Sequence, residues 1–222
     1  MKNLLFILLA SMSVMTVFAQ DYNEEEILAL NDSLNTNPEY VSQWCDTEIN
    51  KATKNPDVYL LKSMYLSRKE DYKGAIKYID RAIKYTKEDS RISKAGVFYL
   101  RGMTYLFAKD YDKAIKSFSN SIKLDSTLTE SYKERIELYS KKGRYDLAVQ
   151  DAEKLISIEP RYVNMLILAK CYIKQNELEK AFDMIEFVIK NKPELQESYQ
   201  LLSEINNILK ERESQNNHWY CC

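Results

Sequence analysis

The sequence predicts an all-α fold, a solenoid of about four antiparallel helix pairs with further helices before them and a capping helix after them. The 222 residues include only four glycines and four prolines, too few for the turns of many short strands. One pattern of apolar residues occurs four times, each time with helical spacing. The joins within the predicted pairs are two or three residues long, which forces the paired helices to run antiparallel.

The N-terminal segment 1–19 has the layout of a secretory signal peptide. A lysine precedes an apolar run, and Val17 and Ala19 provide the small-residue motif of a cleavage site. We therefore expect processing after Ala19, a mature chain that begins at Gln20, and an exported protein, periplasmic or secreted. The alternative is an uncleaved anchor, but the run is shorter than the ~20 residues that a membrane-spanning helix needs.

Residues 20–55 are expected to form an N-terminal helical segment. The stretch 24–53 is typical of two helices that are separated near Asn37 and Pro38, because proline favours the first turn of a helix. This segment is also a candidate for a degenerate copy of the repeat that follows.

Residues 56–193 contain the four repeats. In the second helix of each, six apolar or small residues recur at i, i+3, i+4, i+7, i+10 and i+11, which places them on one face. The clearest column consists of alanines that are 39, 34 and 33 residues apart: Ala75, Ala114, Ala148 and Ala181. A small residue at such a position lets two helix backbones approach closely. The longer join at 86–94 has two interpretations, an extended helix or a loop.

The C-terminal part is expected to close the fold. The amphipathic segment 194–214 predicts a helix that caps the open end of the solenoid with a polar outer face. Residues 215–222 are expected to form a flexible tail, since chain ends are commonly disordered.

The four cysteines would be exposed to an oxidising compartment after export. Cys171 lies between apolar neighbours in a predicted helix and is expected to be a buried thiol, whereas Cys45 is either buried or paired. Cys221 and Cys222 adjoin His218 without the spacing of a zinc site. The signal peptide disfavours prenylation of this ending, because that modification is made in the cytosol.

The repeat resembles the tetratricopeptide repeat family, whose unit is a helix–turn–helix of ~34 residues. Its most specific positions here are Gly102, Tyr105, Tyr111 and Ala114. Pro160 and Pro193 lie where the family places a repeat-ending proline, while Ile136 departs from the small residue expected in the first helix. The resemblance covers residues 56–193 and implies a right-handed α-solenoid.

Composition disfavours several classes of function. The chain has 32 Lys and Arg against 33 Asp and Glu, so no excess positive charge favours nucleic acid or an anionic membrane. The sequence has no Gly-rich phosphate loop and no nucleophile elbow, and His218 is its only histidine. We therefore expect no enzyme activity, no metal and no cofactor.

The resemblance implies a scaffold whose first helices line a concave groove for a peptide or a partner helix. Candidate groove residues are apolar in the first two repeats and charged in the last two: Leu60, Met64, Tyr99, Met103, Leu106, Phe107, Lys133, Glu137, Lys141, Lys170 and Lys174. Two alternatives stay open. The apolar residues pack against the N-terminal helices, or the aromatic-rich surface forms a homodimer.

Overall fold

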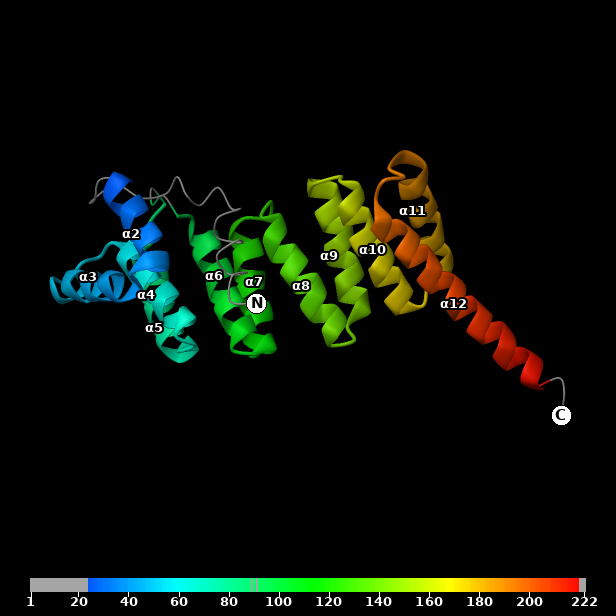
Figure 1. Ribbon diagram of the computed structural model, residues 1–222, viewed down its shortest axis with the longest axis horizontal. Helices are drawn as coiled ribbons and strands as arrows, with labels where there is room; N and C mark the ends of the chain where they lie inside the picture. Colours follow the sequence, from blue (N-terminus) through cyan, green and yellow to red (C-terminus); the bar gives the residue numbers. More distant parts are fainter. Residues whose placement is uncertain (1–23, 89, 91, 220–222) are drawn as a thin grey trace. The chain divides into compact units, whose positions relative to one another are not determined.

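The computed structural model describes residues 24–88, 90 and 92–219, and all regular structure within these residues is α-helical (Figure 1). The prediction of an all-α solenoid of helix pairs is confirmed. The chain divides into two compact units, Met1–Ser126 and Thr127–Cys222. The signal peptide predicted at 1–19 lies outside the described residues.

Six helices belong to the described part of the first unit: α2 (Glu24–Thr36), α3 (Pro38–Asn50), α4 (Pro56–Arg68), α5 (Tyr72–Tyr85), α6 (Lys94–Phe107) and α7 (Tyr111–Leu124). Five belong to the described part of the second: α8 (Thr129–Lys141), α9 (Tyr145–Ile158), α10 (Tyr162–Gln175), α11 (Leu178–Asn191) and α12 (Gln196–Trp219). The four repeats are the pairs α4–α5, α6–α7, α8–α9 and α10–α11, and the helices of each pair pack together.

Small residues mark the line along which the two helices of a repeat cross. Ala75, Ala114, Ala148 and Ala181, here called the seam alanines, are all 0% exposed. In the second repeat Gly102 faces Phe118 across this line, and a Cβ atom at Gly102 would lie 2.5 Å from the Phe118 ring. The side chains leave no room for a larger residue, so the crossing fixes the register of each pair.

A residue in the left-handed backbone conformation ends the first helix of every repeat. The φ angles are 63° at Glu70, 60° at Lys109, 70° at Gly143 and 69° at Asn176. In the second repeat the next amide, that of Asp110, donates to a carbonyl of α6 at 2.9 Å. Since left-handed backbone costs about 1 kcal/mol outside glycine, packing of the paired helices must hold these turns in place.

Polar side chains start the helices of the first unit where the sequence supplies them. Asn55, Asp71, Ser93 and Asp110 each accept a hydrogen bond from a backbone amide in the first turn, at 2.9, 2.9, 3.0 and 3.3 Å. Such a cap typically stabilises a helix by about 1 kcal/mol. These bounds therefore follow from local sequence.

The N-terminal segment forms the two predicted helices. The break is at Asn37, whose side chain accepts a hydrogen bond from the Tyr40 amide at 3.3 Å, and α3 begins at Pro38. Both helices pack on α4 through a cluster that contains Leu34, Cys45 and other buried residues. The N-terminal helices are thus an integral part of the first unit.

For one segment the structure decides between two predictions, and for another it differs from the prediction. Helix α5 ends at Tyr85 and α6 begins at Lys94, so the long join is a loop rather than an extended helix. Helix α12 continues to Trp219, beyond the predicted boundary at residue 214, because the segment after it contains no proline or glycine to end a helix. None of the helices in the described ranges is long and apolar enough to cross a membrane.

Both cysteines within the described residues are buried free thiols. Burial raises the pKa of Cys45 to about 12 and that of Cys171 to about 11. The expectation for Cys171 is confirmed, and Cys45 is buried rather than paired. Cys221 and Cys222 lie outside the described residues.

The crossing of α6 and α7 generates the first prediction. Replacing Gly102 by Ala should lower the free energy of unfolding by about 1–3 kcal/mol, because the added methyl group would overlap the Phe118 ring. The matched control is Gly96→Ala in the first turn of the same helix, where the nearest atom to a new Cβ is 3.4 Å away. The control should stabilise the protein by about 0.5 kcal/mol, since alanine favours helix. Urea unfolding followed by circular dichroism measures both, and shifts of the same sign would contradict the crossing.

Candidate functional site

Three of the predicted groove residues are buried in the structure. Leu60, Tyr99 and Met103 are 3%, 1% and 3% exposed. Leu60 belongs to a core cluster of α4, α5 and α6, and the Tyr99 ring lies 5.7 Å from the Phe118 ring. Their assignment as exposed anchors for a peptide is therefore corrected: they are core residues whose removal would destabilise the first unit.

The remaining apolar candidates are half-buried. Met64 packs against the cluster that α2 and α3 form on α4. For this residue, the alternative that the apolar candidates pack against the N-terminal helices therefore holds. Leu106 and Phe107 lie near the C-terminal end of α6 with intermediate exposure. None of these three offers a large free apolar surface.

The charged candidates lie in the second unit, and three of them form ion pairs with glutamates of that unit. Lys133 of α8 lies 3.4 Å from the Glu159 carboxylate, and Lys174 of α10 lies 3.5 Å from Glu204 of α12. Lys170 forms a similar ion pair with α12, while Glu137 and Lys141 are exposed. Exposed pairs of this kind contribute only ~0–1 kcal/mol each, so they tie helices together weakly.

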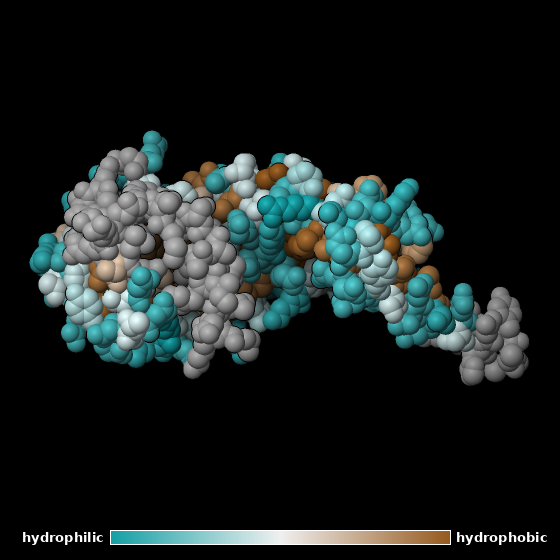
Figure 2. Space-filling model, turned by 45° about the horizontal axis from the view of Figure 1, so that its top comes forward, coloured by the Kyte–Doolittle hydropathy of each residue, from teal (hydrophilic) through white to brown (hydrophobic). Residues whose placement is uncertain are grey.

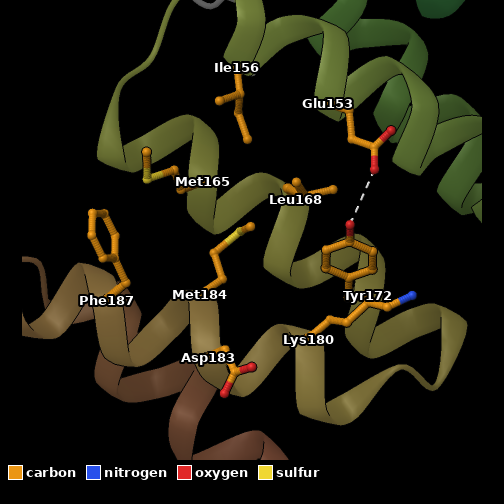
Figure 3. Close-up of a pocket in the computed structure, with 9 residues that line it drawn as sticks. All are labelled: Glu153, Ile156, Met165, Leu168, Tyr172, Lys180, Asp183, Met184 and Phe187. Carbon is orange, nitrogen blue, oxygen red and sulfur yellow. Dashed lines mark hydrogen bonds between the residues drawn. The ribbon is translucent and has the colours of Figure 1, made fainter.

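An apolar surface of the second unit lies elsewhere, in a cleft of about 570 Å³ that α9, α10 and α11 line. Its apolar wall and floor come from Ile156, Met165, Leu168, Met184 and Phe187, whose side chains converge in Figure 3. Phe187 is 50% exposed at one end. In Figure 2 the face in view is mainly hydrophilic, with hydrophobic residues exposed in places among the polar ones.

Polar groups occupy the other end of the cleft. The Tyr172 hydroxyl donates a hydrogen bond to Glu153 at 3.3 Å, drawn as the dashed line in Figure 3. The Lys180 ammonium lies 5.6 Å from the centre of the Tyr172 ring. Burial, followed by the nearby Glu153 carboxylate, raises the pKa of Tyr172, which therefore stays a neutral donor. Asp183 completes this end.

A pattern in the repeats explains why the cleft is open. The residue thirteen positions before each seam alanine is Lys62, Arg101, Arg135 or Leu168. Each of the three basic residues forms an ion pair with an aspartate of a neighbouring helix: Lys62 with Asp46 at 2.7 Å, Arg101 with Asp80 at 2.8 Å and Arg135 with Asp151 at 2.5 Å. Leu168 is the exception, and it lines the cleft.

The corresponding place in the first unit holds an ion pair. Between α5 and α6, the Arg101 guanidinium bonds the Asp80 carboxylate at 2.8 Å, whereas Glu153 faces Leu168 across the cleft. Leu168 is too short to span that distance and has no charge to pair with Glu153. In the same register, Phe187 stands where the second repeat has Asn120.

Sequence reasoning missed this surface although a signal was present. None of the cleft residues was among the predicted groove residues, because the prediction followed the other side of the first helices. On α10, Lys170 follows Leu168 by two residues, which is a rotation of about 200° around the helix. The signal was Leu168, an apolar residue at a position that is basic in the other three repeats.

The described residues contain no group of three or more His, Cys, Asp and Glu side chains that could hold a metal ion.

Comparisons with known proteins place this architecture. A family model for the tetratricopeptide repeat matches residues 56–89, 95–128 and 137–162. Sperm-associated antigen 1 of Rattus norvegicus is 28% identical over 114 residues, which are 51% of this chain and 13% of that protein. The chain thus corresponds to a small part of the curated relative.

Two solved structures share the fold. The C-terminal part of a TPR repeat-containing protein from Cytophaga hutchinsonii superposes with a TM-score of 0.66 at 20% identity, over 82% of this chain and 70% of that one. YrrB, described as a TPR protein with an unusual peptide-binding site, superposes with a TM-score of 0.64 at 16% identity, over 91% of this chain and 100% of that one. At these identities the similarity concerns the fold.

The ion pair between Arg135 and Asp151 generates the second prediction. Asp151→Asn should lower the free energy of unfolding by about 1.5–3 kcal/mol, because the change removes the charge that faces a largely buried guanidinium. The control is Glu153→Gln, two residues further along α9 with an exposed side chain, which should change stability by less than about 0.5 kcal/mol. Chemical denaturation of the two variants tests this, and equal stabilities would mean that the buried pair is not stabilising.

Proposed function

Because the chain belongs to the tetratricopeptide repeat family, we propose that it is a non-catalytic scaffold that binds a peptide segment of a partner protein in the cleft of α9, α10 and α11. The observation that carries this proposal is the apolar cleft at the fourth repeat. In that repeat Leu168 stands at the position where the other three repeats have a lysine or an arginine. The repeats with a basic residue use it for an internal ion pair instead.

The shape and composition of the cleft suit a short apolar segment. A volume of about 570 Å³ accommodates a few side chains of a peptide. Met165 and Met184 line it, and methionine side chains adapt to partners of different shape. Peptide binding by YrrB supports a peptide as the kind of ligand.

Binding energy would come mainly from the apolar end. Phe187 is half-exposed and its ring lies 6.3 Å from that of Tyr162, so a partner side chain would cover an aromatic surface that is already held in place. Buried aromatic anchors dominate the energetics of such interfaces. The charged first-helix residues Lys170 and Lys174 are already paired with α12, and we assign them to stability rather than to binding.

A homodimer is the second candidate. Tyr199 and Leu209 of α12 are each 42% exposed, and no helix in the described part of the chain follows α12 to cover them. A second copy of the chain could pack there. Light scattering of the purified protein distinguishes a dimer from a monomeric scaffold.

The third prediction concerns the cleft. Peptides selected from a displayed random library on the wild-type protein should bind at least about tenfold more weakly to Leu168→Arg and to Phe187→Asn. The first change copies the filled arrangement at Arg101 and the second copies Asn120. Fluorescence anisotropy with a labelled selected peptide measures the affinities, and a tenfold loss corresponds to about 1.4 kcal/mol.

Phe187→Asn should remain folded because it replaces a half-exposed side chain, whereas Leu168 is only 4% exposed. Circular dichroism therefore checks that Leu168→Arg is folded before its affinity is compared. The control is Lys170→Ala on the opposite side of α10, which should bind the same peptide with nearly wild-type affinity. If both cleft variants bind as well as the wild type, the cleft is not the site.

We also propose that the protein is exported, on the basis of the charged, apolar and small-residue pattern of residues 1–19. The fourth prediction is that the form recovered from the extracytoplasmic fraction begins at Gln20. Intact-mass spectrometry of that form decides this. Recovery of the form that retains Met1 would instead favour an anchor.

A further inference from the structure

The first helices of the second and third repeats each hold an arginine against a tyrosine ring and a carboxylate. The Arg101 guanidinium bonds Asp80 and its central carbon lies 5.1 Å from the centre of the Tyr105 ring. The Arg135 guanidinium, bonded to an aspartate of α9, lies 5.6 Å from the centre of the Tyr139 ring. Both arginines thus combine a tyrosine ring four residues further along the helix with a carboxylate, which comes from the preceding repeat for Arg101 and from the same repeat for Arg135.

Between α9 of the third repeat and α10 of the fourth, the carboxylate and the ring are present without the cation. Tyr172 is nine residues before its seam alanine, as Tyr105 is, and Glu153 is five residues after its seam alanine, as Asp80 is. Leu168 takes the place of the arginine. Among the described residues Glu153 has no ion pair, and its hydrogen bond is with the Tyr172 hydroxyl.

The number of cations at each ring shows the same difference. Tyr105 has Arg101 at 5.1 Å and Lys113 at 5.5 Å, and Tyr139 likewise has two arginines within 5.6 Å. In the described part of the chain Tyr172 has Lys180 alone, at 5.6 Å. The position that Arg101 occupies relative to Tyr105 has no cation at Tyr172.

The charge of the cleft favours a cation there. Glu153 and Asp183 are acidic lining residues, and Lys180 is the basic one. The Lys180 ammonium also lies 3.5 Å from the Glu177 carboxylate, which offsets part of its charge. At the place of Asp183 the second repeat has Lys116, so the sign of the charge is reversed between the two repeats.

We propose that the partner supplies the missing cation as an arginine that lies next to an apolar residue. Its guanidinium bonds Glu153 and covers the Tyr172 ring, while its methylene groups and the neighbouring apolar side chain contact Met184 and Phe187. This inference rests on the proposed function, because it specifies the chemistry of the peptide that enters the cleft. A planar guanidinium bonds a carboxylate through two N–H groups and stacks on a ring, which lysine does less well.

The test selects a displayed library of random dodecapeptides in parallel on the wild-type protein, Glu153→Gln and Leu168→Arg. Wild-type selections should be enriched in arginine within three residues of an aromatic or large aliphatic residue. That enrichment should disappear on Glu153→Gln, while the apolar preference remains. On Leu168→Arg these peptides should not be selected, because the protein then carries its own guanidinium in the cleft.

A second measurement uses one selected peptide and its analogue with citrulline, the neutral isostere of arginine. Citrulline should weaken binding to the wild type by about three- to tenfold, and the difference should vanish on Glu153→Gln. Tyr172→Phe serves as the control for the ring: it keeps the aromatic face and should retain the preference for arginine.

The outcomes separate the two proposals. One outcome is that the selected peptides bind the wild type but not Leu168→Arg, and show no preference for arginine over lysine or contain no arginine. This outcome overturns the inference and leaves the proposed function standing. Peptides whose binding is indifferent to Leu168→Arg, or the absence of peptides specific to the wild type, overturn the proposed function as well.

Discussion

The close crossing of the two helices within each repeat is the constraint on which the rest of the structure depends. The seam alanines are fully buried, and in the second repeat the contact between Gly102 and Phe118 has no room for one more methyl group. Small residues at the crossing hold every pair in one register. Residues at the same distance from a seam alanine therefore occupy corresponding positions in different repeats.

This equivalence gives single substitutions a defined effect on the surface. Lys62, Arg101 and Arg135 each use a carboxylate of a neighbouring helix, so each joins two helices and covers the surface between them. Leu168 preserves the helix but not the ion pair, and an apolar cleft results. The repeat architecture supplies stability through many similar contacts, and an exception in one column supplies an exposed site.

The parts of the fold that depend on local pattern were predictable from the sequence. The seam alanines, the helix start at Pro38 and the pairing of helices follow from spacing, capping and short joins. The location of the exposed apolar surface was not, because the exposure of Tyr99 depends on which other elements pack over it. The cleft was predictable in principle from Leu168, but its significance emerges once the ion pairs of the corresponding residues are known.

The left-handed turns at Glu70, Lys109, Gly143 and Asn176 give the four junctions within the repeats similar φ angles. Because the backbone passes through the same conformation at all four junctions, recombination there would join the first helix of one repeat to the second helix of another without changing the junction itself. A transferred α10 would bring Leu168 and Tyr172, which line the cleft, between two helices other than α9 and α11. The crossing limits such exchanges to helices that fit each other: Ile136 of α8 stands where Gly102 faces Phe118, so α8 could not replace α6 without a clash.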